Sequence, residues 1–164
     1  FGVILEGFYG DSAVTVPVGE VSESAMKLMR TTRSSLYAGI DACRAGNSLK
    51  DIARAIESTV KPHHYGVVKE FVGHGIGQRL HEDPQIPNYE AGASNLKLKP
   101  GMTVCLEPMI SEGKPGVRIL DDKWTAVTED GKLSAHYEHT VLITEGDPEI
   151  LSDWEGSAYG WRID

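Results

Sequence analysis

Apolar and polar positions follow strand spacing at the start of the chain. Residues 1–5 form an apolar run rich in β-branched side chains, and residues 8–16 form a second run of the same kind. Glu6 and Gly7 stand between them as a two-residue turn signal. This arrangement predicts that the chain opens with a β-hairpin.

Two amphipathic helices are predicted after this hairpin. Ser22 is an N-cap residue for the first helix, and Gly46 is its stop signal. Its apolar stripe consists of Met26, Met29, Leu36, Tyr37, Ile40 and Cys43. Ser48 and Asp51 have the spacing of a capping box for the second helix, which Pro62 ends. Both stripes indicate core positions, so the helices should cover one face of a sheet.

The remaining pattern predicts strands and one long loop. The expected strands are 102–106, 117–120, 124–128 and 133–144, the expected loop is 84–100, and residues 147–164 show no clear element. A strand pair followed by two helices and then several strands is typical of the α+β class. A chain of 164 residues is long enough for one domain with a real core, so we expect a single domain over residues 1–164.

Composition excludes some classes of partner. The chain has 24 acidic and 16 Lys or Arg residues and a formal charge of -8, which argues against nucleic acid and against an anionic membrane surface. No apolar run approaches the roughly 20 residues of a membrane span. Cys43 and Cys105 have no spacing that suggests a disulfide framework or a zinc site, and a reduced, cytoplasmic setting accounts for them.

A glycine-rich stretch carries the first sign of chemistry. Gly73, Gly75 and Gly77 surround His74 at alternate positions, so the backbone can approach another group closely while one imidazole projects. His81 supplies a second imidazole shortly afterwards. This stretch is typical of a functional site.

Two glutamates lie within apolar or β-branched runs. They are Glu107 in the sequence CLEP and Glu138 in the sequence HYEHT. A carboxylate is costly to bury alone, which predicts a nearby cation. Together with Asp11 and His74 they form a donor set of oxygen and nitrogen atoms that suits Mn, Fe(II), Co or Zn.

Each of these residues also has a simpler interpretation. The carboxylates would be solvated charges, Asp11 a turn or cap residue, and His81 a cap for the loop after it. His63 and His64 are adjacent, but no carboxylate or cysteine lies close to them in sequence. A solvated loop explains this pair better than a metal site.

Five motifs in order resemble one family. They are GDSAVTVPVG at 10–19, GHGIG at 73–77, HEDP at 81–84, LKPGMTVCLEPM at 98–109 and YEHT at 137–140. Their order is similar to that of type I methionine aminopeptidases, metal-dependent enzymes that remove initiator methionine. The resemblance implies a pita-bread fold, in which a curved antiparallel sheet is covered by helices.

The resemblance also implies roles for individual residues. Asp11, His74, Glu107 and Glu138 match metal ligands, with Asp11 and Glu138 bridging two divalent ions; the identity of the metal stays open among Co, Mn, Fe(II) and Zn. Glu107 would in addition carry a proton from water to the leaving amine. His81 would lie beside the substrate amide as a catalytic and substrate-binding residue and not as a ligand.

Three positions bear on the shape of the site. His136 stands where the family commonly has Gln, and we interpret it as a hydrogen-bond partner of the ligands rather than as a ligand. Leu80 stands where the family usually has a Phe that lines the methionine pocket. Trp124 matches an aromatic residue of the pocket wall, although a Trp in a strand is by default a core residue.

The resemblance further implies an N-terminal truncation. The remaining family ligand, an Asp, would lie immediately before Phe1, and the first half of the fold would precede it. On this interpretation the 164 residues alone are inactive.

Three functions remain open at this point. The first is removal of N-terminal methionine from nascent proteins, with Met peptides and the ribosome as candidate partners. The second is a proline-specific peptidase of the same fold. The third is a catalytically silent pita-bread module that binds other proteins.

Overall fold

The computed structural model describes residues 1–153 of the chain. Within them lie two long helices, α1 (Glu23–Asp41) and α2 (Leu49–Val60), and two 3₁₀ turns, η1 (Lys61–His63) and η2 (Glu90–Gly92). The strands are β1 (Gly2–Leu5), β2 (Phe8–Ala13), β3 (Gly66–Val67), β4 (Gly73–Gly75), β5 (Glu82–Ile86), β6 (Thr103–Leu106), β7 (Met109–Ser111), β8 (Val117–Ile119), β9 (Ala126–Thr128), β10 (Ser134–His136), β11 (Glu138–Leu142) and β12 (Glu149–Ile150).

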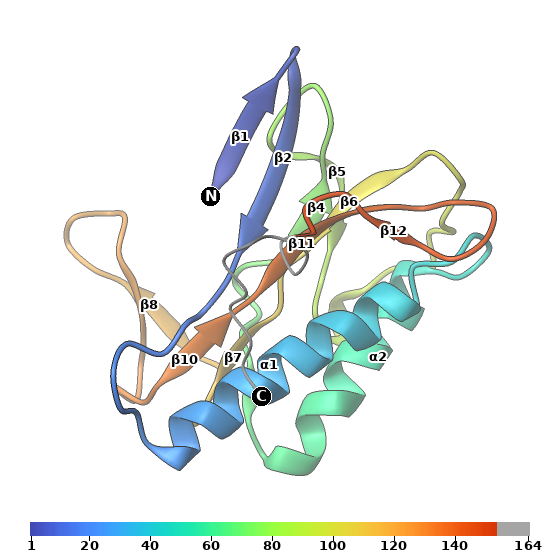
Figure 1. Ribbon diagram of the computed structural model, residues 1–164. Coiled ribbons are helices and arrows are strands. Elements are labelled where there is room, and N and C mark those ends of the chain that lie inside the picture. The colour runs from blue at the N-terminus through green and yellow to red at the C-terminus, as the bar shows by residue number, and fades with distance from the viewer. Residues whose placement is uncertain (154–164) are drawn as a thin grey trace.

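One large antiparallel sheet organises the molecule. Its strand order is β1-β2-β11-β6-β4-β5, and β12 pairs with β11 beside this path. Strands β10, β7 and β3 form a smaller sheet, and β8 pairs with β9. Helices α1 and α2 lie side by side against one face, as Figure 1 shows. The α+β class and the two-helix cover are therefore confirmed.

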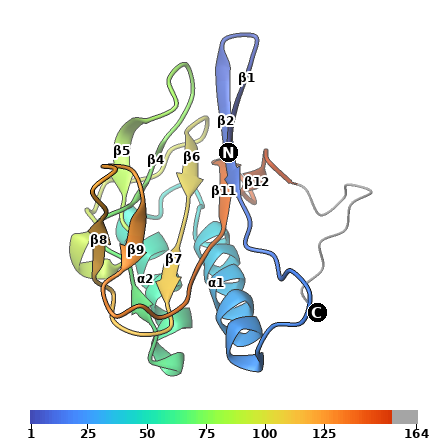
Figure 2. The same cartoon turned by 90° about the vertical axis from the view of Figure 1, so that its left-hand side faces the viewer.

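The opening hairpin forms as predicted. Glu6 and Gly7 have φ values of 51° and 85°, so both turn residues adopt the left-handed conformation that a two-residue hairpin loop needs. The returning strand ends at Ala13, before the expected residue 16. The hairpin projects beyond the rest of the sheet (Figures 1 and 2), and most of its large apolar side chains are exposed.

Both helix starts are confirmed. The Ser22 hydroxyl accepts a hydrogen bond from the backbone N–H of Ala25 at 3.2 Å, and the Ser48 N–H donates to the Asp51 carboxylate at 2.8 Å. Helix α1 ends at Asp41, several residues before the glycine at position 46, because the chain tightens there into shorter-range hydrogen bonds. The stop signal therefore marks the loop and not the last helical residue.

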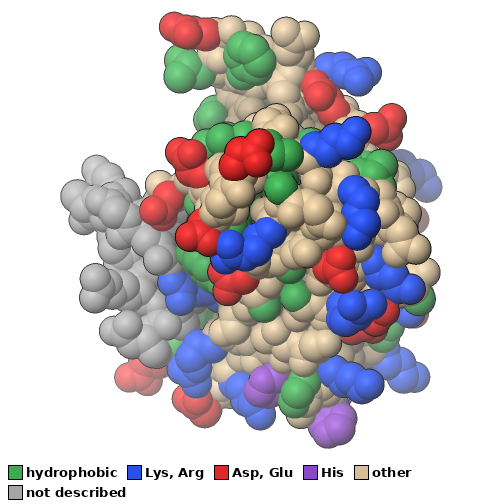
Figure 3. Space-filling view, turned by 90° about the vertical axis from the view of Figure 1, so that its right-hand side faces the viewer, with side chains coloured by type: hydrophobic (Ala, Val, Ile, Leu, Met, Phe, Trp, Pro, Cys, Tyr) green, Lys and Arg blue, Asp and Glu red, His purple; other side chains and the backbone are tan. Residues whose placement is uncertain are grey.

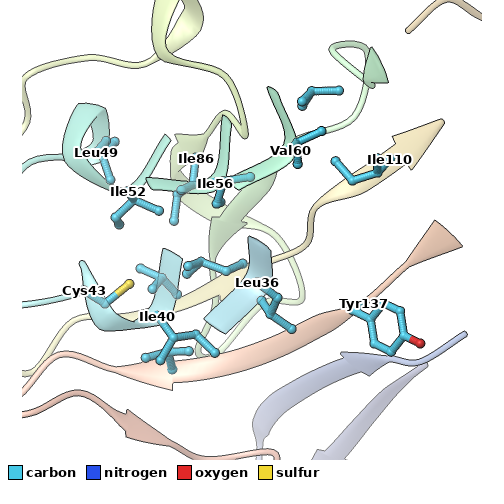
Figure 4. Packing of buried hydrophobic residues seen from close by; sticks show 14 of the residues in the cluster. Leu36, Ile40, Cys43, Leu49, Ile52, Ile56, Val60, Ile86, Ile110 and Tyr137 are labelled. Atoms are coloured by element: carbon cyan, nitrogen blue, oxygen red, sulfur yellow. The ribbon is translucent and has the colours of Figure 1, made fainter. Parts of the chain in front are cut away.

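The core lies between the two helices and the sheet. Side chains from α1, α2 and the strands interdigitate there (Figure 4). Gly39 marks the point of closest approach, since a Cβ at this position would lie 2.8 Å from Ile56 of α2 and 3.1 Å from Leu106 of β6. The absence of a side chain at Gly39 lets α1 pack closely against both α2 and β6.

Three predictions of secondary structure need correction: one loop, one strand and the irregular C-terminal segment. The expected loop over residues 84–100 contains most of β5, which pairs with β4. Strand β4 lies within the glycine-rich stretch, and all three of its residues are buried. The two strands approach closely, since a Cβ on Gly75 would lie 2.3 Å from the carbonyl oxygen of Asp83. The expected strand over residues 133–144 is two strands in different sheets, separated at Tyr137. Residues 149–150 form β12, whereas residues 154–164 of the expected irregular tail lie outside the described part.

Three further observations concern the surface, the helices and the cysteines. Lys and Arg side chains are interspersed with Asp and Glu on the face shown in Figure 3. No helix within residues 1–153 is both long enough and apolar enough to cross a bilayer. Cys43 and Cys105 are both buried and neither forms a disulfide.

Candidate metal centre

Four neighbouring strands place one residue each in a single row across the sheet. Cys105 of β6 is paired with His74 of β4 on one side and with Thr140 of β11 on the other. The Thr140 hydroxyl accepts from the backbone N–H of Asp11 at 3.0 Å and donates to its carbonyl at 2.8 Å, which extends the row to β2. Residues in register project from the same face of a sheet. The row therefore brings Asp11 and His74 onto one face despite their separation in sequence.

Two glutamates lie one step along from this row. Glu138 is two residues before Thr140, and Glu107 is two residues after Cys105. Side chains alternate along a strand, so both carboxylates share the face of the row. Oε1 of Glu107 lies 3.5 Å from Nε2 of His74. The face opposite the helices thus carries a cluster of carboxylate and imidazole groups.

His74 is held in the state that a metal ligand needs. Its Nδ1 lies 2.9 Å from the carbonyl oxygen of Gly75, and because a carbonyl can only accept, Nδ1 carries the proton. Nε2 is then left with a free lone pair on the side of Glu107. Burial lowers the pKa of His74, which favours the neutral ring.

The two glutamates are costly to ionise where they lie. Burial, followed by the charges of Glu138 and Asp11, raises the pKa of Glu107 to about 8. Burial and the charge of Asp11 raise the pKa of Glu138 to about 7. Oε1 of Glu138 is buried without a hydrogen-bond partner. A bound cation would relieve both the repulsion and the missing contact.

The ring of His136 lies beside the carboxyl group of Glu107. Its Nε2 is 3.8 Å from Oε2 of Glu107 and is buried without a hydrogen-bond partner. Burial lowers the pKa of His136 to about 4, so the ring is neutral near neutral pH. Glu107, His136 and Glu138 each offer a ligand atom within 4.8 Å of the others. Our interpretation of His136 as a hydrogen-bond partner stays a prediction, and ligation is within its reach.

Asp11 lies at the margin of the cluster. Its Oδ1 accepts from the backbone N–H of Ser12 at 2.9 Å and is 3.7 Å from the amino group of Phe1. Among residues 1–153 the groups of three mutually close ligand atoms do not include Asp11. Its charge still acts on both glutamates. The bridging role of Asp11 stays a prediction.

The donor set fits divalent cations. It offers carboxylate oxygens and neutral imidazole nitrogens, which suit borderline and hard first-row ions. The orphaned Oε1 of Glu138 and Nε2 of His136 lie where an ion would complete their contacts. These observations support the expectation of a metal centre on this face.

Known proteins are similar to this chain over most of its length. The model of metallopeptidase family M24 matches residues 1–145, which include every residue of the cluster. The chain belongs to metallopeptidase family M24. Methionine aminopeptidase 1 of Bacillus subtilis is 48% identical over 151 residues, which are 92% of this chain and 61% of that protein. A crystal structure of methionine aminopeptidase from Thermotoga maritima matches with a TM-score of 0.89 at 47% identity, covering 93% of this chain and 61% of the other.

Two consequences follow from these comparisons. The pita-bread fold that the resemblance implied is confirmed. The chain spans only about three fifths of the length of these M24 relatives. Prolidase from Pyrococcus furiosus matches with a TM-score of 0.71 at 24% identity, covering 93% of this chain and 39% of the other. At this identity the likeness to prolidase shows the fold alone.

A cleft opens beside the cluster of this M24 chain. It has a volume of about 470 Å³, and its lining includes His74, His81 and Glu107. The rings of His81 and His74 meet edge to face with their centroids 4.4 Å apart. His81 is exposed at the cleft, which is a suitable place for contact with a substrate.

The two residues expected to line the substrate pocket lie apart from this cleft. Leu80 packs toward the hairpin, where a Cβ on Gly2 would lie 3.1 Å from its Cδ1. Trp124 lies in the connection between β8 and β9 and is 88% exposed. Neither residue is among those that line the cleft in the described part of the chain. Their roles in substrate binding stay predictions.

Sequence reasoning did not connect Cys105 with the site. Cys105 is fully buried, and its Sγ lies 3.5 Å from the Thr140 hydroxyl. Burial raises the pKa of this thiol above its ordinary value. The missed signal was its position two residues before Glu107, which puts both side chains on the same face of one strand.

Proposed function

We propose that this chain is the metal-binding portion of a methionine aminopeptidase, which hydrolyses the bond after the N-terminal methionine of nascent proteins. The convergence of His74, Glu107 and Glu138 on one face carries this proposal. The high identity to methionine aminopeptidases, set against a likeness to prolidase that reaches only the fold, supports methionine over proline specificity.

We further propose that Asp11, His74, Glu107 and Glu138 hold two divalent ions. When bound, such ions would polarise the scissile carbonyl and activate the attacking water. The metal is Co, Mn, Fe(II) or Zn, since all suit this donor set. His136 either ligates one ion or hydrogen-bonds to its ligands.

Glu107 is proposed to move the proton. Its carboxylate lines the cleft and lies 3.5 Å from Nε2 of His74, beside the place proposed for the ions. From there it can take a proton from the attacking water and give it to the amine that leaves.

His81 is proposed to act on the substrate. It faces the cleft and contacts His74 through its ring edge, while its exposure leaves the imidazole within reach of a peptide. From there it can donate a hydrogen bond to the oxygen that gains charge during attack. The partners would be N-terminal Met peptides and, during synthesis, the ribosome, which corresponds to a cytoplasmic location.

A silent binding module is the remaining alternative. Such a module has no physical need for buried carboxylates with raised proton affinity around an imidazole. The cluster therefore favours an enzyme.

Two assays test the proposal separately. Equilibrium titration of the 164-residue chain with Mn²⁺ should show binding that Glu138→Ala removes and that Glu145→Ala, at an exposed loop position, retains. Release of methionine from the peptide Met-Ala-Ser should require added Mn²⁺ or Co²⁺ in any longer natural protein that contains these residues. A matching Xaa-Pro peptide serves as the substrate control.

The outcomes distinguish the alternatives. Metal-dependent cleavage of the Xaa-Pro peptide but not of Met-Ala-Ser would replace methionine specificity by proline specificity. Metal binding without cleavage of either peptide by the longer protein would favour the binding module. Robust cleavage by the 164 residues alone would overturn the expectation that they are inactive by themselves.

A further inference from the structure

Cys105 lies within the site and not only beneath it. Its Sγ, a ring nitrogen of His74 and a carboxylate oxygen of Glu138 all lie within 4.8 Å of one another. All three residues are buried, with exposed fractions of 0% for Cys105, 7% for His74 and 4% for Glu138. An ion with bond lengths of roughly 2.0–2.3 Å holds tetrahedral ligand atoms roughly 3.3–3.8 Å apart, so small side-chain movements would bring these three atoms around one ion.

A second observation comes from the carboxyl group of Glu138. This group interacts with the Cys105 thiol, yet its Oε1 is buried and has no hydrogen-bond partner. The Thr140 hydroxyl, which approaches Cys105, already bonds to the backbone of Asp11. Glu138 therefore brings an unsatisfied acceptor to the place where the sulfur and the imidazole meet.

We propose that Cys105 is a thiolate ligand, and that His74, Cys105 and Glu138 form a site for a thiophilic divalent cation such as Zn²⁺, Co²⁺ or Cd²⁺. Entry of the cation displaces the thiol proton to solvent and forms a sulfur–metal bond. Sulfur and imidazole together select softer ions than oxygen donors do. The inference rests on the proposed metal centre and not on the aminopeptidase reaction.

The neighbouring group provides an internal contrast. Glu107, His136 and Glu138 also form a close set of three ligand atoms, but these are oxygen and nitrogen only. Glu138 belongs to both sets. The centre would thus have two unlike halves, one that favours thiophilic ions and one that accepts Mn²⁺.

Optical titration with Cd²⁺ tests this inference without any activity measurement. A cadmium–thiolate bond gives a sulfur-to-metal charge-transfer absorption in the ultraviolet, which bonds to carboxylate and imidazole do not give. The full chain, reduced and metal-free, should develop this absorption as Cd²⁺ is added. Mn²⁺ binding, followed separately, supplies the reference for a hard ion.

The two cysteines of the chain offer matched variants. Cys43 is also fully buried, but its Sγ donates to the Gly39 carbonyl at the end of α1, away from the cluster. Cys105→Ser should abolish the absorption and weaken Cd²⁺ binding on the order of tenfold more than Mn²⁺ binding. Cys43→Ser should keep the absorption, and because it leaves Cys105 as the one thiol, it identifies the ligand even if Cys105→Ser folds poorly.

Other results would overturn the inference. Cd²⁺ binding to the parent chain without the absorption would leave the metal centre intact and remove Cys105 from it. Loss of the absorption in Cys43→Ser, or equal weakening of Cd²⁺ and Mn²⁺ in Cys105→Ser, would do the same. No binding of either ion to the parent chain would overturn the metal centre itself and this inference with it.

Discussion

The two faces of the large sheet are built from the same strands but differ in chemistry: one is apolar and packs against the helices, and the other carries the polar candidate metal centre. In β6, Val104 and Leu106 are fully buried in the core beneath the helices, whereas Cys105, together with Glu107 directly after the strand, faces the candidate metal centre. The helix side is apolar and closely packed, as at Gly39. The other side holds carboxyl groups that resist ionisation.

This difference shows where stability and chemistry are divided in the molecule. Burial of apolar side chains stabilises the fold on the helix side. Burial of carboxylates destabilises it on the other side unless a cation is bound. Because side chains alternate along a strand, one strand serves both faces at neighbouring positions.

The largest expected effect is a loss of stability when a core side chain on the helix side of the sheet is shortened. Ile56→Ala would leave a cavity where α2 meets Gly39 of α1, and should lower the free energy of unfolding by about 2–5 kcal/mol. Urea denaturation measures it. Ile119→Ala, at a position that is 49% exposed, is the matched control and should change little. Equal losses in both variants would contradict a core confined to the helix side.

The next prediction tests, on the other face of the sheet, whether His81 contacts the substrate or the metal. His81→Ala should leave metal affinity largely unchanged and raise the barrier to methionine release by about 3 kcal/mol, because His81 is assigned to the substrate. Metal titration and peptide kinetics on an active, longer protein measure the two effects. His63→Ala is the control, since this ring stacks on Tyr65 and does not line the cleft. Loss of metal binding in His81→Ala would make His81 a ligand.

The next expected effect concerns pH in the metal-free chain. The pKa of Glu107 is raised to about 8 in the fold, so the folded state binds this proton more tightly than the unfolded state does. Its contribution is fully present below the unfolded pKa of roughly 4.5 and is lost as pH rises toward 8. By itself Glu107 should therefore lower stability through this window by roughly 5 kcal/mol at most, whereas the lowered pKa values of His136 and His74 act in the opposite direction below about pH 6.5.

Denaturation in EDTA at several pH values measures that fall. Glu107→Gln carries no titrating group and should reduce the pH dependence, whereas Glu145→Gln, at an exposed position, should preserve it. Added Mn²⁺ should stabilise the parent most at the upper end of the window, where the carboxylates are charged. The same change in stability between pH 6.5 and 8 in the parent and in Glu107→Gln would refute the assignment.

The smallest prediction concerns the start of α1. Ser22→Ala removes the acceptor for the Ala25 N–H and should cost about 1 kcal/mol of stability without changing metal affinity. Ser58→Ala, at an exposed position within α2, is the control and should be close to neutral. A change in metal affinity would show that α1 and the opposite face of the sheet are coupled.

Local signals explain what the sequence could predict of the fold. The turn at Glu6 and Gly7 and the caps at Ser22 and Ser48 depend on residues close together in the chain. Periodicity then assigned the helices. By contrast, the break at Tyr137 depends on which sheet each half of the segment joins. No pattern within the segment carries that information.

The candidate site divides in the same way. His74, Glu107 and Glu138 could be selected because each is a polar residue in an apolar or glycine-rich setting. Cys105 was harder to select, because a cysteine in an apolar strand resembles any core residue. Its one local signal is the two-residue spacing to Glu107, and the pairing with His74 is known only from the fold. The position of Asp11 outside both close groups likewise depends on side-chain direction rather than on residue type.

Residues 146–153, which follow the family match, matter for the choice of the C-terminal end of an expressed protein. The match ends at residue 145, but the Ser152 hydroxyl accepts from the backbone N–H of Thr140 at 2.9 Å and lies 3.0 Å from Nδ1 of His139. Strand β12 also pairs with β11 just before this contact. Expression limits drawn from the family match alone would remove these contacts with β11, so a shortened protein should be designed to end after Asp153.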